Sequence, residues 1–218
     1  MRQILLLITL TLWTSLNLQA QQREEVRSAT PFLYAEFKKA KVIQPFGRFI
    51  ETDANIFLKD ASLCYLDNDT IKKAYLDKII AVHFDSAVYW KVDGRYMGEV
   101  IAEKNYNYLV RVRTIDMEQH TKETDGTLNS SFFEFDGIGR MHNTFIDMYG
   151  DFHAQKGFPL KEKFYFVVKG RSVVANESHI RKEISSKSMD KFKELMNDRW
   201  WSWRNEESLI MLLELLPK

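Results

Sequence analysis

Cysteine is almost missing from this 218-residue chain, which holds only Cys64. A lone cysteine excludes an internal disulfide, the device that holds many small exported domains together. The chain must therefore fold around an ordinary core, and its residues are 45% hydrophobic and 13% aromatic. Cys64 stands in the apolar run SLCYL, where we expect a small core residue.

An excess of charge of one sign is also missing. The chain has 31 Lys and Arg against 30 Asp and Glu, a formal net charge of +1. A protein with this balance has no strong field to attract nucleic acid or an anionic lipid surface, so we expect no nucleic-acid partner.

The longest largely apolar stretch lies at the start of the chain, in MRQILLLITLTLWTSLNLQA, residues 1–20. This stretch has the layout of an export signal: the basic Arg2, an apolar region over 4–16 and a cleavage-site motif at 18–20. We expect cleavage before Gln21. The alternative is a single membrane anchor, but the run is short for a span of about 20 residues. We expect no transmembrane span after cleavage. No cysteine lies at the cut to carry a lipid, and export without disulfides favours the periplasm or cell surface of a Gram-negative bacterium.

Motifs that carry chemistry are absent as well. The sequence has no Gly-x-Ser-x-Gly, no phosphate-binding glycine loop and no His-Glu-x-x-His run, and its five histidines are not spaced as helical metal ligands. We therefore predict no catalytic residue, no metal and no cofactor. The one alternative is a hydrolase site in the 140–153 segment, where His142, Asp147, Asp151 and His153 share a glycine-rich stretch; scattered loop residues explain them as well.

What is present is a pattern of short strands. Between 54 and 175, β-rich runs alternate with turn residues, including the hairpin pair Asp93-Gly94. Alternation over 108–114 puts Tyr108, Val110 and Val112 on one face, with Leu109 and the two arginines on the other. We predict strands at 87–92, 96–103 and 131–136 and a hairpin over 163–175. Residues 21–53 are interpreted as a leader and edge segment, and 119–130 as a loop.

After residue 175 the period becomes helical. We expect helices over 176–218, with Ser178, Ser188 and Asn205 as N-caps. The predicted fold class is α+β: an antiparallel β-meander, closing toward a barrel or a sandwich, with a small C-terminal helical subdomain. The predicted units are therefore the signal peptide (1–20), the leader (21–53), the β-rich domain (54–175) and the helical subdomain (176–218).

Three tryptophans fall within RWWSW near the end. Helical spacing from Met196 predicts that Trp200 and Trp203 pack inward and that Trp201 faces outward. An outward Trp201, together with Trp90, is the basis for a glycan-binding hypothesis, because sugar rings stack on aromatic faces.

The final run LIMLLELL is apolar almost all round and too short to span a bilayer. An all-round apolar helix is usually internal. The alternative is that its leucines dock on a protein partner: Leu209, Leu212, Leu213 and Leu216.

Two stretches resemble recurring parts of uncharacterised exported envelope proteins of Gram-negative gut-type bacteria. These are ANIFLKDASLCYLDNDTIKKAYLDKIIAVHFDSAVYWKVDGRYMGEVIAE, and the tail SHIRKEISSKSMDKFKELMND with EESLIMLLELL. The resemblance implies a β-meander with a helical tail and supplies no activity or site. The functional hypothesis is a non-enzymatic exported envelope protein that binds or scaffolds another macromolecule, with an envelope protein or a glycan as its partner.

Overall fold

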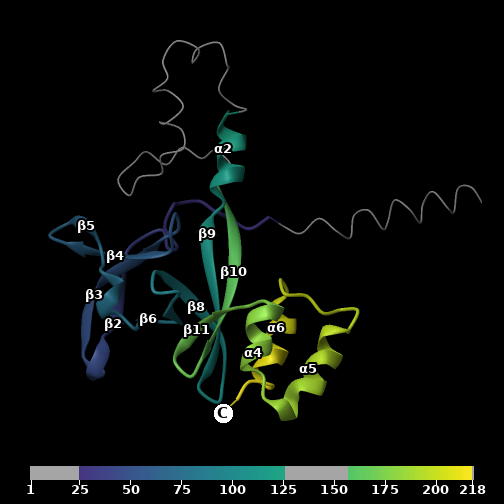
Figure 1. Ribbon diagram of the computed structural model, residues 1–218. Coiled ribbons are helices and arrows are strands. Elements are labelled where there is room, and N and C mark those ends of the chain that lie inside the picture. Colours follow the sequence, from purple (N-terminus) through teal and green to yellow (C-terminus); the bar gives the residue numbers. More distant parts are fainter. Residues whose placement is uncertain (1–24, 126–156, 218) are drawn as a thin grey trace, which may run out of the picture.

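The computed structural model describes residues 25–125 and 157–217 (Figure 1). The expected signal peptide, the expected strand at 131–136 and the 140–153 segment lie outside these residues.

The core of the fold is an antiparallel sheet that curls into a half-barrel (Figure 1). Its strands run in the order β1-β10-β9-β8-β7-β6-β2-β3-β4-β5, and β11 pairs with β10. The α+β class with a β-meander is therefore confirmed. The strands are β1 Arg27–Ser28, β2 Lys38–Ile43, β3 Phe49–Phe57, β4 Ser62–Asp67, β5 Thr70–Lys73, β6 Ala81–Phe84, β7 Ala87–Val92, β8 Tyr96–Lys104, β9 Asn107–Ile115, β10 Phe158–Val168 and β11 Arg171–Val174.

Tight turns of two or three residues explain why the chain forms a meander. The predicted turn pair Asp93-Gly94 joins β7 to β8 with both φ angles positive, 53° and 70°. Asn105-Tyr106 does the same between β8 and β9, with φ angles of 53° and 63°. This geometry matches the right-handed twist of the strands that it joins, so neighbours in sequence become neighbours in the sheet.

The leader interpretation of residues 21–53 is wrong for its second half. Strand β2 lies inside the sheet, paired with β3 on one side and β6 on the other. The expected boundary at residue 54 falls within β3. The polar lysines of β2 conceal this role, because only Ala40 and Val42 on this strand are buried.

The expected loop at 119–130 is also wrong at its start, where helix α2 spans Met117–Asp125. The carboxylate of Asp116 accepts hydrogen bonds from the backbone N–H groups of Glu118 and Gln119, which satisfies the open helix start. The helix has little apolar content, so hydrophobic periodicity could not reveal it.

The C-terminal helices pack on one face of the sheet around β9 and β10 (Figure 1). They are α4 Glu177–Glu183, α5 Met189–Met196 and α6 Glu206–Leu213; short 3-10 turns are η2 Pro45–Gly47, η3 Leu76–Lys78 and η5 Ser186–Ser188. Asn205 caps α6 as predicted. Asn176, not Ser178, caps α4, and Ser188 precedes α5 without a side-chain cap.

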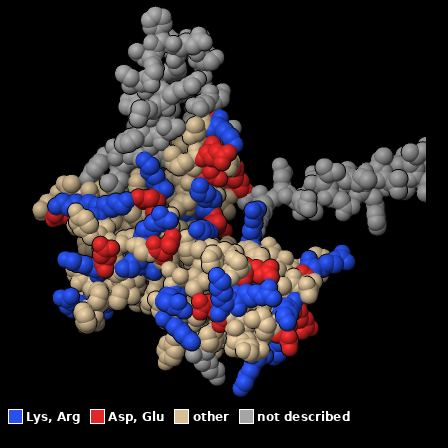
Figure 2. Space-filling view, viewed as in Figure 1, with Lys and Arg blue, Asp and Glu red and all other residues tan. Residues whose placement is uncertain are grey.

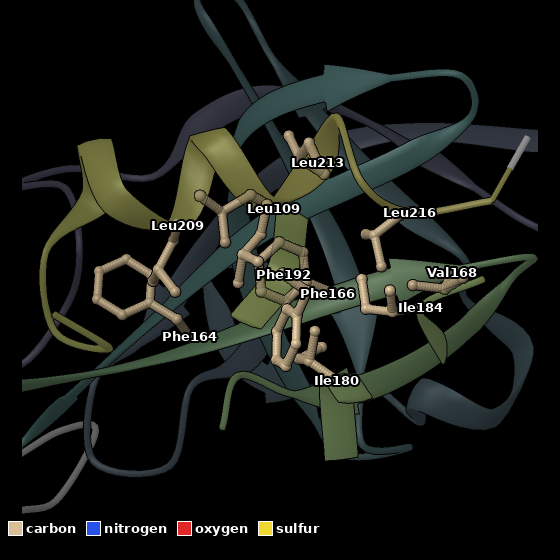
Figure 3. Packing of buried hydrophobic residues seen from close by; sticks show 11 residues of the cluster. Leu109, Phe164, Phe166, Val168, Ile180, Ile184, Phe192, Leu209, Leu213 and Leu216 are labelled. Carbon is tan, nitrogen blue, oxygen red and sulfur yellow. The ribbon is translucent and has the colours of Figure 1, made fainter. Parts of the chain in front are cut away.

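Both faces of the sheet are buried along strands β9 and β10. Leu109, Phe164 and Phe166 pack against the helices (Figure 3), whereas Val110 and Val112 pack on the opposite face. The predicted alternation along 108–114 is confirmed. The helices share this core with the sheet, so they complete the domain rather than form a separate one.

Candidate functional site

The two tryptophans of the glycan hypothesis lie in different cores. Trp90 stacks on Tyr108 with 4.9 Å between ring centroids, in the apolar cluster around Val110. Trp201 packs edge-to-face on Trp203 at 5.3 Å, in the cluster beneath the helices, and its Nε1 is buried. The structure therefore does not bring Trp201 and Trp90 together as a stacking platform.

The predicted orientations within RWWSW are wrong for two of the three tryptophans. Trp200 is 84% exposed, while Trp201 joins Trp203 against the core. The physical reason is that α5 ends at Met196, with Asn197 as its C-cap. The helical phase therefore does not extend to residue 200.

The four leucines assigned to partner docking are part of the chain's own core. Their exposed fractions are at most 4%, and three of them, Leu209, Leu213 and Leu216, are labelled where they meet the sheet in Figure 3. A partner could not contact them while α6 stays packed, which corrects the docking assignment in favour of burial: Leu209, Leu212, Leu213 and Leu216.

The proposed hydrolase residues, His142, Asp147, Asp151 and His153, lie outside the described part of the chain. Within residues 25–125 and 157–217, no group of three or more His, Cys, Asp or Glu side chains is arranged to hold a metal ion. In the same ranges, no helix is long and apolar enough to cross a membrane.

A groove on the half-barrel is the strongest candidate site. It forms because the chain from Ala74 to Ile80 crosses the sheet face, a segment that we call the 74–80 crossing. At one end the Ala74 N–H donates to Leu63 O of β4 at 2.8 Å. At the other, the Ile80 N–H donates to Ile43 O of β2 at 2.9 Å. The crossing therefore bridges β4 and β2 and leaves the sheet face next to the β2–β3 hairpin uncovered.

We call this space the hairpin groove, and its volume is about 420 Å³. That volume falls in the usual range for small-molecule sites, about 300–1,000 Å³. Its floor belongs to the buried core of the half-barrel: Val42, Leu63 and Ile79. The walls add partly buried or exposed side chains: Ile50, Tyr65, Leu66, Ala74 and Tyr75. Most of the lining is therefore apolar, and much of it is aliphatic.

The β2–β3 hairpin and the 74–80 crossing carry several exposed apolar side chains. Nine large hydrophobic residues are exposed in the described ranges, and four belong to the hairpin or the crossing: Phe46 at 95%, Phe49 at 52%, Ile50 at 51% and Tyr75 at 87%. Contiguous exposed apolar surface is usually a binding surface. Of these four, Ile50 and Tyr75 line the hairpin groove. Phe49 points to the opposite face of the hairpin, where the Lys41 ammonium lies 3.9 Å from its ring centroid. The candidate site is therefore the groove with Ile50 and Tyr75 at its edge.

The hairpin tip carries a further unusual feature. Phe46 has φ 63° and ψ 31°, a left-handed conformation that a bulky side chain adopts at a cost. Gly47, with φ 71°, follows it. The turn presents an almost fully exposed aromatic ring, which packing within the described chain does not explain. Tyr106, 83% exposed with φ 63°, has the same backbone conformation in the β8–β9 turn, so the conformation itself marks a tight turn.

A second cluster, on β8, β9 and β10, contains the charged groups best placed for chemistry. Arg111 donates to Glu99 and to Glu206 at 2.8 Å each, and Arg113 donates to Glu162 at 3.0 Å. Burial lowers the pKa of Arg111, but the hydrogen bond to Glu99 and the surrounding carboxylates raise it overall. Since each of these carboxylates is held by a guanidinium, the cluster joins elements of the fold and offers no uncommitted base.

Two tyrosines lie beside that cluster. Burial raises the pKa of Tyr89, and the nearby Glu99 carboxylate adds to this effect. Burial also raises the pKa of Tyr34, which hydrogen-bonds Tyr89. Both phenols are therefore held neutral, which suits structural hydrogen bonds and not proton abstraction near neutral pH.

Sequence reasoning missed the hairpin groove. The signal available was PFGRFI, residues 45–50, where aromatic and aliphatic residues flank a glycine turn. That stretch suggested an edge strand or irregular wrapping, because nothing local shows that the crossing leaves the neighbouring sheet face open.

The surface on the face drawn in Figure 2 mixes Lys and Arg with Asp and Glu, in keeping with the balanced composition. No protein-family model, curated protein or solved structure matches the chain.

Proposed function

We propose that the protein is a non-enzymatic, exported binding module of a Gram-negative envelope, and that it holds its ligand in the hairpin groove. One observation carries the proposal: a largely apolar groove of about 420 Å³ lined by Ile50 and Tyr75, each more than half exposed. Burying such side chains against a ligand releases about 1.5–3 kcal/mol for each large side chain.

The paired charged groups and the buried thiol of the chain support a binding role rather than a catalytic one. Arg111, Arg113 and their carboxylates are paired with one another. Burial raises the pKa of Cys64 to about 11, so its thiol is a poor nucleophile near neutral pH. The export signal expected at 1–20 is the support for an envelope location.

The test compares wild type with Ile50→Asp, which places a charge in the groove wall at a half-exposed position. Immobilised protein is exposed to envelope extract separated into protein, glycan and lipid fractions, and retained material is quantified. We expect one fraction to be retained by wild type and at least tenfold less by Ile50→Asp.

The matched control is Tyr106→Ala, which removes an 83% exposed aromatic from the β8–β9 turn, outside the groove lining. It should behave as wild type. Equal retention by all three proteins, or none from any fraction, would show that the groove is not a binding site.

A further inference from the structure

We infer that the hairpin groove takes the hydrocarbon chain of a single-chain anionic amphiphile, a ligand of the fatty-acid type. The inference rests on the proposed function and names the ligand class of that same site. Three features carry it: the aliphatic walls, the pairing of Asp67 and the orientation of Glu51, and one lysine at the rim.

The walls select against sugars and in favour of an alkyl chain. Val42, Leu63 and Ile79 form the floor, and Ile50 and Leu66 extend it toward solvent. None of these side chains can accept or donate a hydrogen bond. The hydrogen-bonding side chains of the lining are few, chiefly Gln44, Thr52 and the two tyrosine hydroxyls of Tyr65 and Tyr75. A glycan on the aliphatic floor would bury hydroxyls there without partners, which costs free energy for each buried polar group. An alkyl chain has no such group to desolvate.

Of the two acidic residues of the lining, one is paired and the other points away from the groove. Asp67 is held in an ion pair by Lys72. Glu51 lies in register with Lys41, while its neighbour Ile50 pairs with Val42. Because successive strand residues point to opposite faces, the Glu51 side chain is directed away from the face that carries Val42. Neither carboxylate therefore places an uncompensated negative charge in the groove.

Lys78 supplies the cation. It lies in η3 of the 74–80 crossing, lines the groove and is exposed. No hydrogen bond or ion pair to another residue of the described chain engages its ammonium. A carboxylate or similar head group at the rim would meet this charge while its chain enters the aliphatic interior, an arrangement that satisfies both ends of the ligand.

The exposed hairpin residues fit the same ligand. Phe46 at the tip and Tyr75 on the crossing can cover the part of a chain that projects from the groove. Arg48 follows the tip, and its carbonyl oxygen accepts from the N–H of Gln44, a groove residue. The groove lining thus combines the Tyr75 ring with the Lys78 side chain.

The experiment is a calorimetric titration of the full chain with octanoate, decanoate and dodecanoate. Each ligand is kept below its critical micelle concentration. Each methylene buried should raise affinity about fourfold, until the groove is filled. Dodecyltrimethylammonium has the same chain and the opposite head-group charge, and it should bind more weakly than dodecanoate. A maltooligosaccharide should show no binding.

Two variants assign the two ends of the ligand. Ile50→Asp should weaken dodecanoate at least tenfold, and Lys78→Gln should weaken it about two- to fivefold, as expected for a solvent-exposed ion pair. Lys78→Gln should not weaken the cationic probe and should modestly strengthen it, because the repulsion between the two ammonium groups is removed. Tyr106→Ala should bind every probe as wild type does, and thermal melts should show that all variants stay folded.

Several results would overturn the inference. If affinity does not increase with chain length, or if Ile50→Asp leaves it unchanged, the alkyl chain does not bind in the groove. Equal affinity for the cationic and anionic probes would show that the groove does not select an anionic head group. If no alkanoate binds while envelope material is still retained through the groove, the amphiphile inference fails and the proposed function stands. If no envelope fraction depends on the groove, the proposed function fails whatever the alkanoates do.

Discussion

Arg111 on β9 reaches the C-terminal helix α6, where its Nη1 donates to Glu206 Oε2 at 2.8 Å. The same guanidinium donates to Glu99 of β8, so one side chain ties two strands to the helix. Its side chain is 18% exposed, and that of Glu206 is 38% exposed. The Arg111–Glu206 ion pair therefore holds α6 on the sheet in addition to the apolar core that they share.

Arg111→Met should destabilise the protein by about 1–3 kcal/mol, because it leaves partly buried carboxylates without their donor. Glu206→Gln alone should cost less than about 1 kcal/mol, since this carboxylate is more exposed. In the Arg111→Met background, Glu206→Gln should cost nothing. The measurement is urea unfolding of all four proteins. Arg171→Met, at a 71% exposed side chain paired with Glu183, is the control and should be neutral.

Helix α6 provides a matched pair of neighbours for testing the burial of the terminal helix. Leu212 is 0% exposed and Met211 is 49% exposed. Leu212→Ala should lower the free energy of unfolding by about 2–5 kcal/mol, and Met211→Ala should change it by less than about 0.5 kcal/mol. Equal effects in chemical denaturation would contradict the packing of α6 on β9.

The thiol of the lone cysteine should not react with a disulfide reagent in the folded protein. Cys64 is 0% exposed, and burial raises its pKa to about 11. At pH 8 only about one thiol in a thousand would be ionised, even before access is considered. A chromogenic disulfide reagent should therefore label Cys64 only as the protein unfolds in urea. Thr70→Cys in a Cys64→Ala background, at an exposed edge-strand position, should react at once.

The parts of the fold that sequence could predict are those fixed by local rules. Alternation located Leu109 and Val110 on opposite faces, and Asp93-Gly94 marked its turn, because both signals act over a few residues. The assignment of Trp200 failed because a helical phase was extended past Met196, where the helix ends.

The candidate site could not be predicted in the same way. The hairpin groove depends on where the 74–80 crossing attaches, at Leu63 of β4 and Ile43 of β2. These partners lie far from one another in sequence, and no local pattern encodes which part of a sheet face a crossing leaves open. Trp201 and Trp90 attracted attention as residue types, yet tertiary packing placed them in two separate cores.

His120 on α2 should make the stability depend on pH. It is 6% exposed, lies 5.3 Å from the ring of Phe158, and its pKa is lowered by burial. Below about pH 6.5 the unfolded chain binds a proton that the folded chain resists, so unfolding is favoured. This contribution is complete above that pH and is lost as pH falls toward the folded pKa. Urea midpoints at pH 7.5 and 5.5 should therefore differ more for wild type than for His120→Gln. His179→Gln, at an exposed histidine, should keep the wild-type difference, and an equal difference in all three proteins would exclude His120 as its source.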